Sequence, residues 1–162
     1  MGLINALRLA DNPALHAAAA LGQPIVLVFI LDEDSEGLRP LGGASRWWLH
    51  HSLAAVSRDF KDKLGLTLIL RRGSTASILE KIIQETGAKA IFWNRRYGAK
   101  EIQIDTQLKS AFTDAGLDVR SFQGQLLHEP YKVKTGSGGP YRVYTPFWRA
   151  VSGGPAPRAP LP

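Results

Sequence analysis

The 162-residue sequence contains no cysteine, and this absence excludes a disulfide framework, a thiolate metal site and a catalytic thiol. Long apolar runs are also missing: the longest, residues 25–31, is far shorter than the roughly 20 residues of a membrane-spanning helix. No basic segment followed by an apolar one opens the chain, so we expect a cytoplasmic protein with no membrane partner. No nucleophile–base pair, metal-ligand cluster or catalytic pair of carboxylates stands out, so the sequence predicts a ligand pocket rather than a catalytic centre.

What the sequence does contain is typical of one globular domain. Hydrophobic residues make up 44% and charged residues 21%, close to the averages for folded domains. The 20 Lys and Arg against 14 Asp and Glu give a net charge of +6, which weakly favours polyanionic partners and is also ordinary for a soluble protein. From residue 152 the chain reads SGGPAPRAPLP and offers nothing with which to build a core. We therefore predict a compact domain over residues 1–150 and a Pro/Gly-rich tail over 151–162.

Apolar runs alternate along the chain with amphipathic stretches, the pattern of an α/β fold with a parallel sheet. Residues 1–9 take the place of a first strand, but only Leu3-Ile4 and Ala6-Leu7 are strand-like, so we expect that strand to be shortened. After Phe122 no periodic pattern is recognisable. The further strands are expected at residues 25–31, 66–70, 90–93 and 117–122. Helices are expected from Asn12 towards Gly22, over about residues 44–63, from Ser74 to Gly87, and through residues 104–112 towards Gly116.

Three loops leave the carboxyl ends of the predicted strands, where ligands bind in open parallel sheets. These are residues 32–43, which are acidic, residues 71–75, and residues 94–101. Together they offer donors and acceptors near helix N-termini, a suitable setting for a flat polar ligand. A purely structural reading stands beside this one, because Gly42-Gly43 lacks the full dinucleotide-binding fingerprint.

Paired aromatic and histidine residues follow the first of these loops. His50 and His51 are adjacent on a predicted helix and point in different directions, so they are unsuited to binding one metal ion. Trp47 and Trp48 offer rings on which a ligand could stack, but helical spacing predicts that at least one of them faces the core.

Five segments of the chain form a recognisable set of motifs. Residues 7–15 (LRLADNPAL) and 140–148 (PYRVYTPFW) are the specific ones, and between them lie residues 28–32 (VFILD), 44–49 (ASRWWL) and 93–94 (WN). Taken together and in this order, these segments resemble those of DNA photolyases and cryptochromes. The resemblance covers nearly all of residues 6–150. It implies the N-terminal α/β domain of that family, a Rossmann-like three-layer sandwich around a five-stranded parallel sheet.

In that family this domain holds an antenna chromophore, which is a folate, a deazaflavin or a flavin. Its excitation passes to FAD in a separate helical domain, which binds DNA and splits pyrimidine dimers by electron transfer. The motifs for FAD and DNA lie beyond this chain. We therefore expect no bound FAD, no catalysis by this chain alone, and contact with DNA only through a helical FAD-binding domain on a separate chain.

The resemblance also implies four chromophore contacts. Lys100-Glu101 stands where folate-using members carry an Asn-Glu pair, so the acidic acceptor is kept and the amide is replaced by a lysine. A carboxylate can accept hydrogen bonds from the aminopyrimidine edge of a folate. Asp32, at a strand end, and Arg46, at a helix start, correspond to residues that line the same pocket in deazaflavin and flavin users. Asp32, Arg46, Lys100 and Glu101 are thus the predicted cofactor-binding residues.

Both ends of the chain depart from the family pattern. Residues 1–6 (MGLINA) replace an apolar strand and a charged Arg-Arg-Asp motif, and SGGPAPRAPLP stands where members continue towards the helical domain. We therefore expect a truncated chain, the light-harvesting antenna domain of a photolyase-type flavoprotein without its catalytic half. Two alternatives are a cryptochrome-like signalling or interaction module and a non-functional photolyase remnant.

Overall fold

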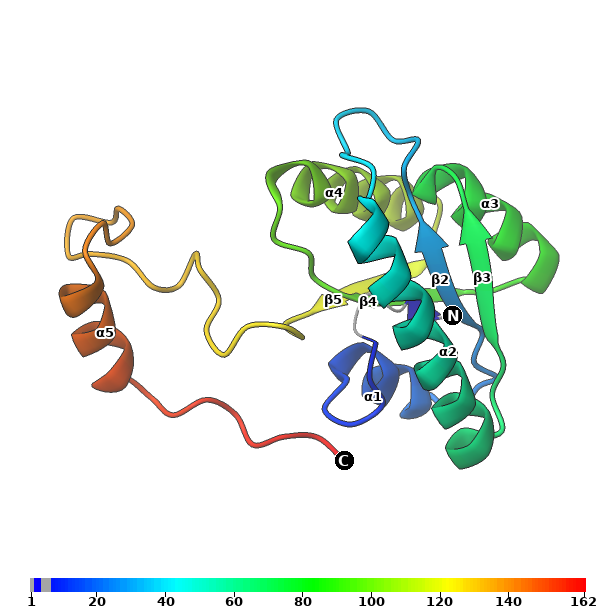
Figure 1. The fold of residues 1–162 in the computed structure, drawn as a ribbon, viewed down its shortest axis with the longest axis horizontal. Helices are drawn as coiled ribbons and strands as arrows, with labels where there is room; N and C mark the ends of the chain where they lie inside the picture. Colours follow the sequence, from blue (N-terminus) through cyan, green and yellow to red (C-terminus); the bar gives the residue numbers. More distant parts are fainter. Residues whose placement is uncertain (1, 4–6) are drawn as a thin grey trace. The chain divides into compact units, whose positions relative to one another are not determined.

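The computed structural model describes residues 2–3 and 7–162. Strands and helices alternate along these residues (Figure 1). In chain order the elements are β1 (Gly2–Leu3), α1 (Pro13–Ala19), β2 (Leu27–Leu31), α2 (Gly43–Leu64), β3 (Leu68–Arg72), α3 (Thr75–Thr86), β4 (Ala90–Asn94), α4 (Ala99–Asp114), β5 (Asp118–Phe122) and α5 (Tyr144–Ser152). The α/β class with parallel strands, expected from the sequence, is confirmed.

Contacts along the chain separate two compact units. The first comprises residues 1–124 with 161–162 and contains the strands and helices α1 to α4; the second comprises residues 125–160 and contains α5. Of the helices that the structure describes, none has both the length and the apolar character needed to cross a membrane.

Within the described residues the strand pairs are all parallel, and the longest ladders join β2 with β3 and β4 with β5. In the first ladder Leu27 lies opposite Leu68. The short strand β1 lies between the two ladders, where Gly2 pairs with Leu27 on one side and with Phe92 on the other, so the strand order is β3-β2-β1-β4-β5. Ile4 and Ala6, which the sequence placed in strand-like pairs, lie outside the described residues.

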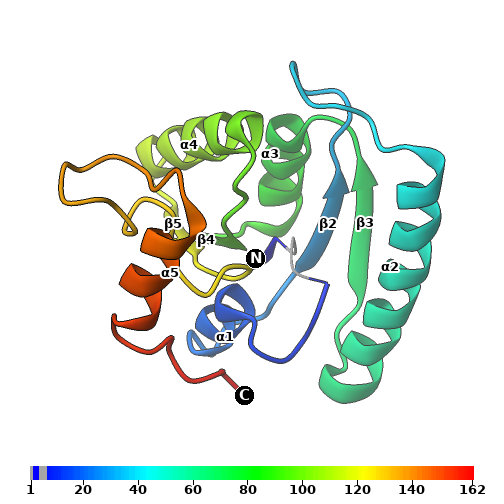
Figure 2. The same cartoon turned by 60° about the vertical axis from the view of Figure 1, so that its left-hand side comes forward.

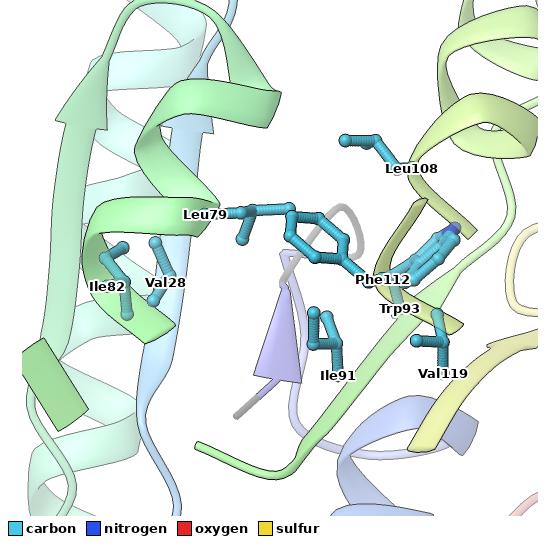
Figure 3. Packing of buried hydrophobic residues seen from close by; sticks show 8 residues of the cluster. All are labelled: Val28, Leu79, Ile82, Ile91, Trp93, Leu108, Phe112 and Val119. Atoms are coloured by element: carbon cyan, nitrogen blue, oxygen red, sulfur yellow. The ribbon is translucent and has the colours of Figure 1, made fainter. Parts of the chain in front are cut away.

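Apolar side chains alternate between the two faces of the strands, and each face is covered by helices (Figure 2). On one face, α3 and α4 pack over the strands. Figure 3 shows this cluster, which consists of Val28, Leu79, Ile82, Ile91, Trp93, Leu108, Phe112 and Val119. On the other face, α2 packs through Val56 and Phe60 onto Leu27 and Leu68, and α1 packs through Ala14 and Ala18 onto Phe92.

Local signals fix the ends of several helices. The Oδ1 atom of Asn12 accepts a hydrogen bond from the backbone N–H of Leu15 at 3.2 Å, and Pro13 occupies the first helical position, so the predicted start of α1 is confirmed. Gly87 ends α3 with φ of +65°, a left-handed conformation that glycine adopts without a steric penalty.

Two expectations were wrong. Trp47 and Trp48 are 66% and 60% exposed, so neither faces the core; the part of α2 that is fully buried against the strands is further along, at Val56 and Phe60. The chain after Phe122 is also not wholly irregular, because α5 forms there. Its signal was present: Pro146 lies in the first turn, where proline is tolerated, and Phe147 and Trp148 follow Tyr144 at the helical spacing of three and four residues.

Candidate functional site

A cavity of about 760 Å³ opens at the carboxyl ends of the strands in the first unit. Its walls come from the end of β2 and the two residues after it (Phe29 to Glu33), from the following loop (Leu38, Arg39 and Leu41), from the first turns of α2 (Ala44, Ser45, Trp48 and Leu49), and from Arg96 after β4 and Glu101 in α4. The predicted loops 32–43 and 94–101 therefore meet here. The volume falls within the range of about 300–1,000 Å³ that is common for small-molecule and cofactor pockets.

Asp32 lines this cavity, but its carboxylate is already occupied by protein donors. Oδ1 accepts hydrogen bonds from the backbone N–H groups of Asp34 (3.3 Å) and Ser35 (2.9 Å). Oδ2 accepts from Ser35 Oγ (2.7 Å) and from both the backbone N–H (2.9 Å) and Oγ1 (2.6 Å) of Thr75. Burial alone would raise the pKa of Asp32, but the hydrogen bonds from Thr75 and Ser35 outweigh it and hold the pKa below its ordinary value. Asp32 thus ties the end of β2 to the start of α3.

Glu33 is a functional candidate that sequence reasoning missed. Its side chain is only 6% exposed, and its carboxylate pairs with Arg46 at 2.6 Å and with Arg72 at 3.2 Å. It also accepts a hydrogen bond from the backbone N–H of Leu41 at 3.1 Å. The one available signal was its place directly after Asp32 at the end of a buried strand. Its partners are distant in the sequence, so the pairing was not predictable.

Glu101 reaches the cavity from the first turn of α4. Its carboxylate folds back over Gly98, the residue that precedes the helix: a Cβ atom at position 98 would lie 2.1 Å from Oε2 of Glu101. Only glycine leaves room for this arrangement. A carboxylate in this place also interacts favourably with the positive end of the helix dipole.

Two arginines complete the polar lining. Arg96 is held by Asp105, whose Oδ1 accepts from Nε at 3.1 Å and from a terminal nitrogen at 2.5 Å. Because Asp32, Glu33 and Arg96 are engaged in these ways, Glu101 and Arg39 are the charged side chains of the lining that make no such bond within the described residues.

No group of three or more His, Cys, Asp or Glu residues suited to a metal ion was found in residues 2–3 and 7–162.

The structure brings two of the four predicted residues into this cavity. Asp32 and Glu101 line it, whereas Arg46 lies beside it and is bound to Glu33 and to the carbonyl oxygen of Leu41 at 2.9 Å. Lys100 lines a separate cavity of about 500 Å³ between α3 and α4, and its stem lies against Gly37. Successive helical residues point about 100° apart, which explains why Lys100 and Glu101 face different cavities.

Two of the sequence segments quoted above meet in a buried polar cluster. Nδ2 of Asn94, a fully buried residue at the end of β4, donates to Oδ1 of Asn12 at 2.8 Å, and Oδ1 of Asn94 accepts from the backbone N–H of Ala14 at 3.2 Å. Gly124 packs so closely on Asn94 that a Cβ there would lie 2.6 Å from the asparagine side chain. These residues hold α1 against the strands, so their role is structural.

Comparison with known proteins shows that the chain is similar to photolyases and cryptochromes. It is 54% identical to the deoxyribodipyrimidine photo-lyase of Agrobacterium fabrum, over 95% of this chain and 31% of that protein. The crystal structure of a class III photolyase from Agrobacterium tumefaciens superimposes with a TM-score of 0.90 at 51% identity, covering 99% of this chain and 32% of that one. Cryptochrome-1 of Arabidopsis thaliana is 39% identical over 96% of this chain and 23% of its own length.

The chain therefore spans about a third or less of the length of these relatives. The family model for DNA photolyase matches residues 3–162, almost the whole sequence. From this match and these relatives we conclude that the chain belongs to the DNA photolyase family and corresponds to its N-terminal domain.

Proposed function

We propose that this chain is the light-harvesting antenna domain of a photolyase-type flavoprotein and holds an aromatic chromophore in the 760 Å³ cavity. The family binds flavin and antenna chromophores. The observation that carries the proposal is the cavity itself, which combines a ligand-sized volume with one open carboxylate, at Glu101, and one open guanidinium, at Arg39. We take the domain to extend to residue 150, with a continuous Rossmann-like sheet in which β1 is the central strand.

The residues present fit the chemistry of such a chromophore. Leu31, Leu38 and Leu49 give the cavity apolar walls, and the exposed ring of Trp48 borders it, which suits a flat aromatic ligand. The Glu101 carboxylate would accept hydrogen bonds from the donor edge of a pterin or flavin ring. Arg39 would pair with an anionic tail, such as the carboxylates of a folate or the phosphate of a flavin nucleotide. When bound, the chromophore supplies absorption of near-ultraviolet or blue light.

The proposal is tested by titrating the purified chain with three probes: 5,10-methenyltetrahydrofolate, an 8-hydroxy-5-deazaflavin and FMN. We expect at least one of them to bind, with quenching of tryptophan fluorescence. Glu101→Ala should weaken that binding by about tenfold, the loss of one charge-assisted hydrogen bond. Stability should fall by less than about 1 kcal/mol, because the lost favourable interaction with the helix dipole is of that size.

Lys100→Ala is the matched control, since it removes the neighbouring charged side chain from a different cavity. It should leave binding unchanged. Absence of binding for all three probes, or equal losses for the two variants, would refute the assignment of the cavity.

We further propose that the domain works with a helical FAD-binding domain, on a separate chain, in the cytoplasm, and that DNA is contacted only through that partner. The 54% identity to a photolyase, against 39% to cryptochrome-1, favours repair over a cryptochrome-like signalling module. Mixing the chromophore-loaded chain with the separately expressed remainder of the Agrobacterium photolyase tests this. Faster repair of pyrimidine dimers under light absorbed by the antenna supports the antenna role, and no change in rate contradicts it.

A further inference from the structure

We propose that Glu33 is a positioning residue, which fixes the wall of the cavity through Arg46 and the backbone of Leu41 and thereby sets the cavity's affinity for its ligand. The affinity part of this inference rests on the function proposed above. The claim that Glu33 fixes the wall does not, since it concerns only this chain.

The contacts around Glu33 form a closed ring. Oε1 of Glu33 accepts from Arg46 at 2.6 Å and from the N–H of Leu41 at 3.1 Å. Nε of Arg46 in turn donates to the carbonyl oxygen of Leu41 at 2.9 Å. Both backbone groups of Leu41 are therefore held, one by each member of the ion pair. The ring joins the end of β2, the loop before α2 and the first turn of α2.

Packing alone does not hold this wall in place. Leu41 is 36% exposed, so its side chain is only partly covered. Gly42 and Gly43 follow it, and a Cβ atom at either position would meet nothing within 4 Å. Leu41 directly precedes these glycines, and the polar ring anchors its backbone to α2, whereas Leu38 is held by a hydrogen bond from its N–H to the carbonyl oxygen of Ser35 at 3.2 Å.

Burial makes Glu33 the fixed member of the ring. Its side chain is 6% exposed, whereas those of Arg46 and Arg72 are 43% and 68% exposed. Removing the partners of a buried carboxylate leaves a charge that is neither hydrated nor paired, and this destabilises the folded state more than the same loss at an exposed carboxylate. Arg72 pairs with the other carboxylate oxygen and, among the described residues, forms no hydrogen bond with Leu41, so it lies outside the ring.

The first measurement is amide hydrogen exchange of the full chain without ligand. Glu33→Gln keeps the size of the side chain but turns one acceptor oxygen into a donor that faces an arginine. Arg46→Ala breaks the same ring from its exposed side, so it tests the ring even if the Glu33 variant folds poorly. We expect both variants to exchange about tenfold faster over residues 38–44, with β2 and β3 unchanged. Arg72→Ala is the matched control and should leave residues 38–44 protected.

The second measurement is the Kd for whichever of the three probes the wild-type chain binds. Glu33→Gln and Arg46→Ala should each raise this Kd about tenfold, and the double variant should be no weaker than either single one, because both break one ring. Unchanged exchange over residues 38–44 in both single variants overturns the positioning role. Faster exchange with a Kd within twofold of the wild type overturns its effect on affinity. If the wild type binds no probe, the proposed function fails while the exchange result still decides the positioning role.

Discussion

Asp32 and Glu33 are consecutive carboxylates at one strand end, yet they serve different parts of the molecule. Asp32 is bonded to hydroxyl and backbone N–H groups of Ser35 and Thr75, and Glu33 to two arginines and the N–H of Leu41. These two carboxylates of the acidic loop are therefore held in structural contacts, whereas Arg39 of the same loop lines the cavity. The carboxylate best placed to receive a ligand is that of Glu101, from the first turn of α4.

Asp32→Asn should make stability less dependent on pH. The folded-state pKa of Asp32 lies below its unfolded value, so its contribution is present above an unfolded pKa of about 3.9 and is lost as pH falls through the folded pKa. We expect the variant to be less stable than wild type by about 1–2 kcal/mol at pH 7, from weakened hydrogen bonds, and the gap to shrink at pH 3. Urea unfolding of both chains at pH 7, 5 and 3 measures this difference in the free energy of unfolding.

Asp34→Asn makes the same charge change two residues away, at an exposed position, and is the control. It should alter stability by no more than about 0.5 kcal/mol at neutral pH. A gap between Asp32→Asn and wild type that is as large at pH 3 as at pH 7 would show that the ionised carboxylate is not what matters.

At the scale of helices and strands, the sequence was most informative where a single local rule determines the position or the end of the element. The cap at Asn12, the left-handed stop at Gly87 and the positions of β2 to β5 were predictable from residue type and periodicity. The exposure of Trp47 and Trp48 was not, because it depends on where α2 lies over the strands rather than on helical spacing. In the same way, helical direction separates Lys100 from Glu101, although the sequence alone makes them look like a pair.

The start of α4 allows a test of whether Gly98 and Glu101 depend on each other sterically. Gly98 has φ of −69° and ψ of 145°, which alanine adopts freely, and the atoms nearest to a Cβ there all belong to the Glu101 carboxylate. Gly98→Ala should therefore displace that carboxylate and weaken ligand binding as Glu101→Ala does. Its cost in stability should be smaller in the Glu101→Ala background by about 0.5–1 kcal/mol. Thermal unfolding of the four chains measures this coupling, and equal costs in both backgrounds would show that the two residues are independent.

At the scale of the whole molecule, the two units differ in how their backbone is held and in charge. The first contains the parallel ladders and the apolar clusters on both faces. The second, residues 125–160, contains α5, which buries none of its residues. Its sequence holds five Lys and Arg residues and one Glu, a net charge of +4 out of +6 for the chain. Trypsin sites are therefore frequent in the unit with the least protected backbone.

Limited trypsin digestion should accordingly begin in the second unit. Lys132, Lys134 and Arg142 are exposed and lie outside any helix or strand, so the backbone there can enter a protease without breaking a ladder. Arg71 and Arg72 are exposed too, but they belong to β3, which pairs along its length with β2, and cleavage there requires opening of the sheet. Mass spectrometry over a time course should show first a fragment ending between residues 132 and 142, with the peptide bonds after Arg71 and Arg72 intact. Early cleavage after Arg71 or Arg72 would mean that the β2–β3 ladder opens more readily than the backbone of the second unit.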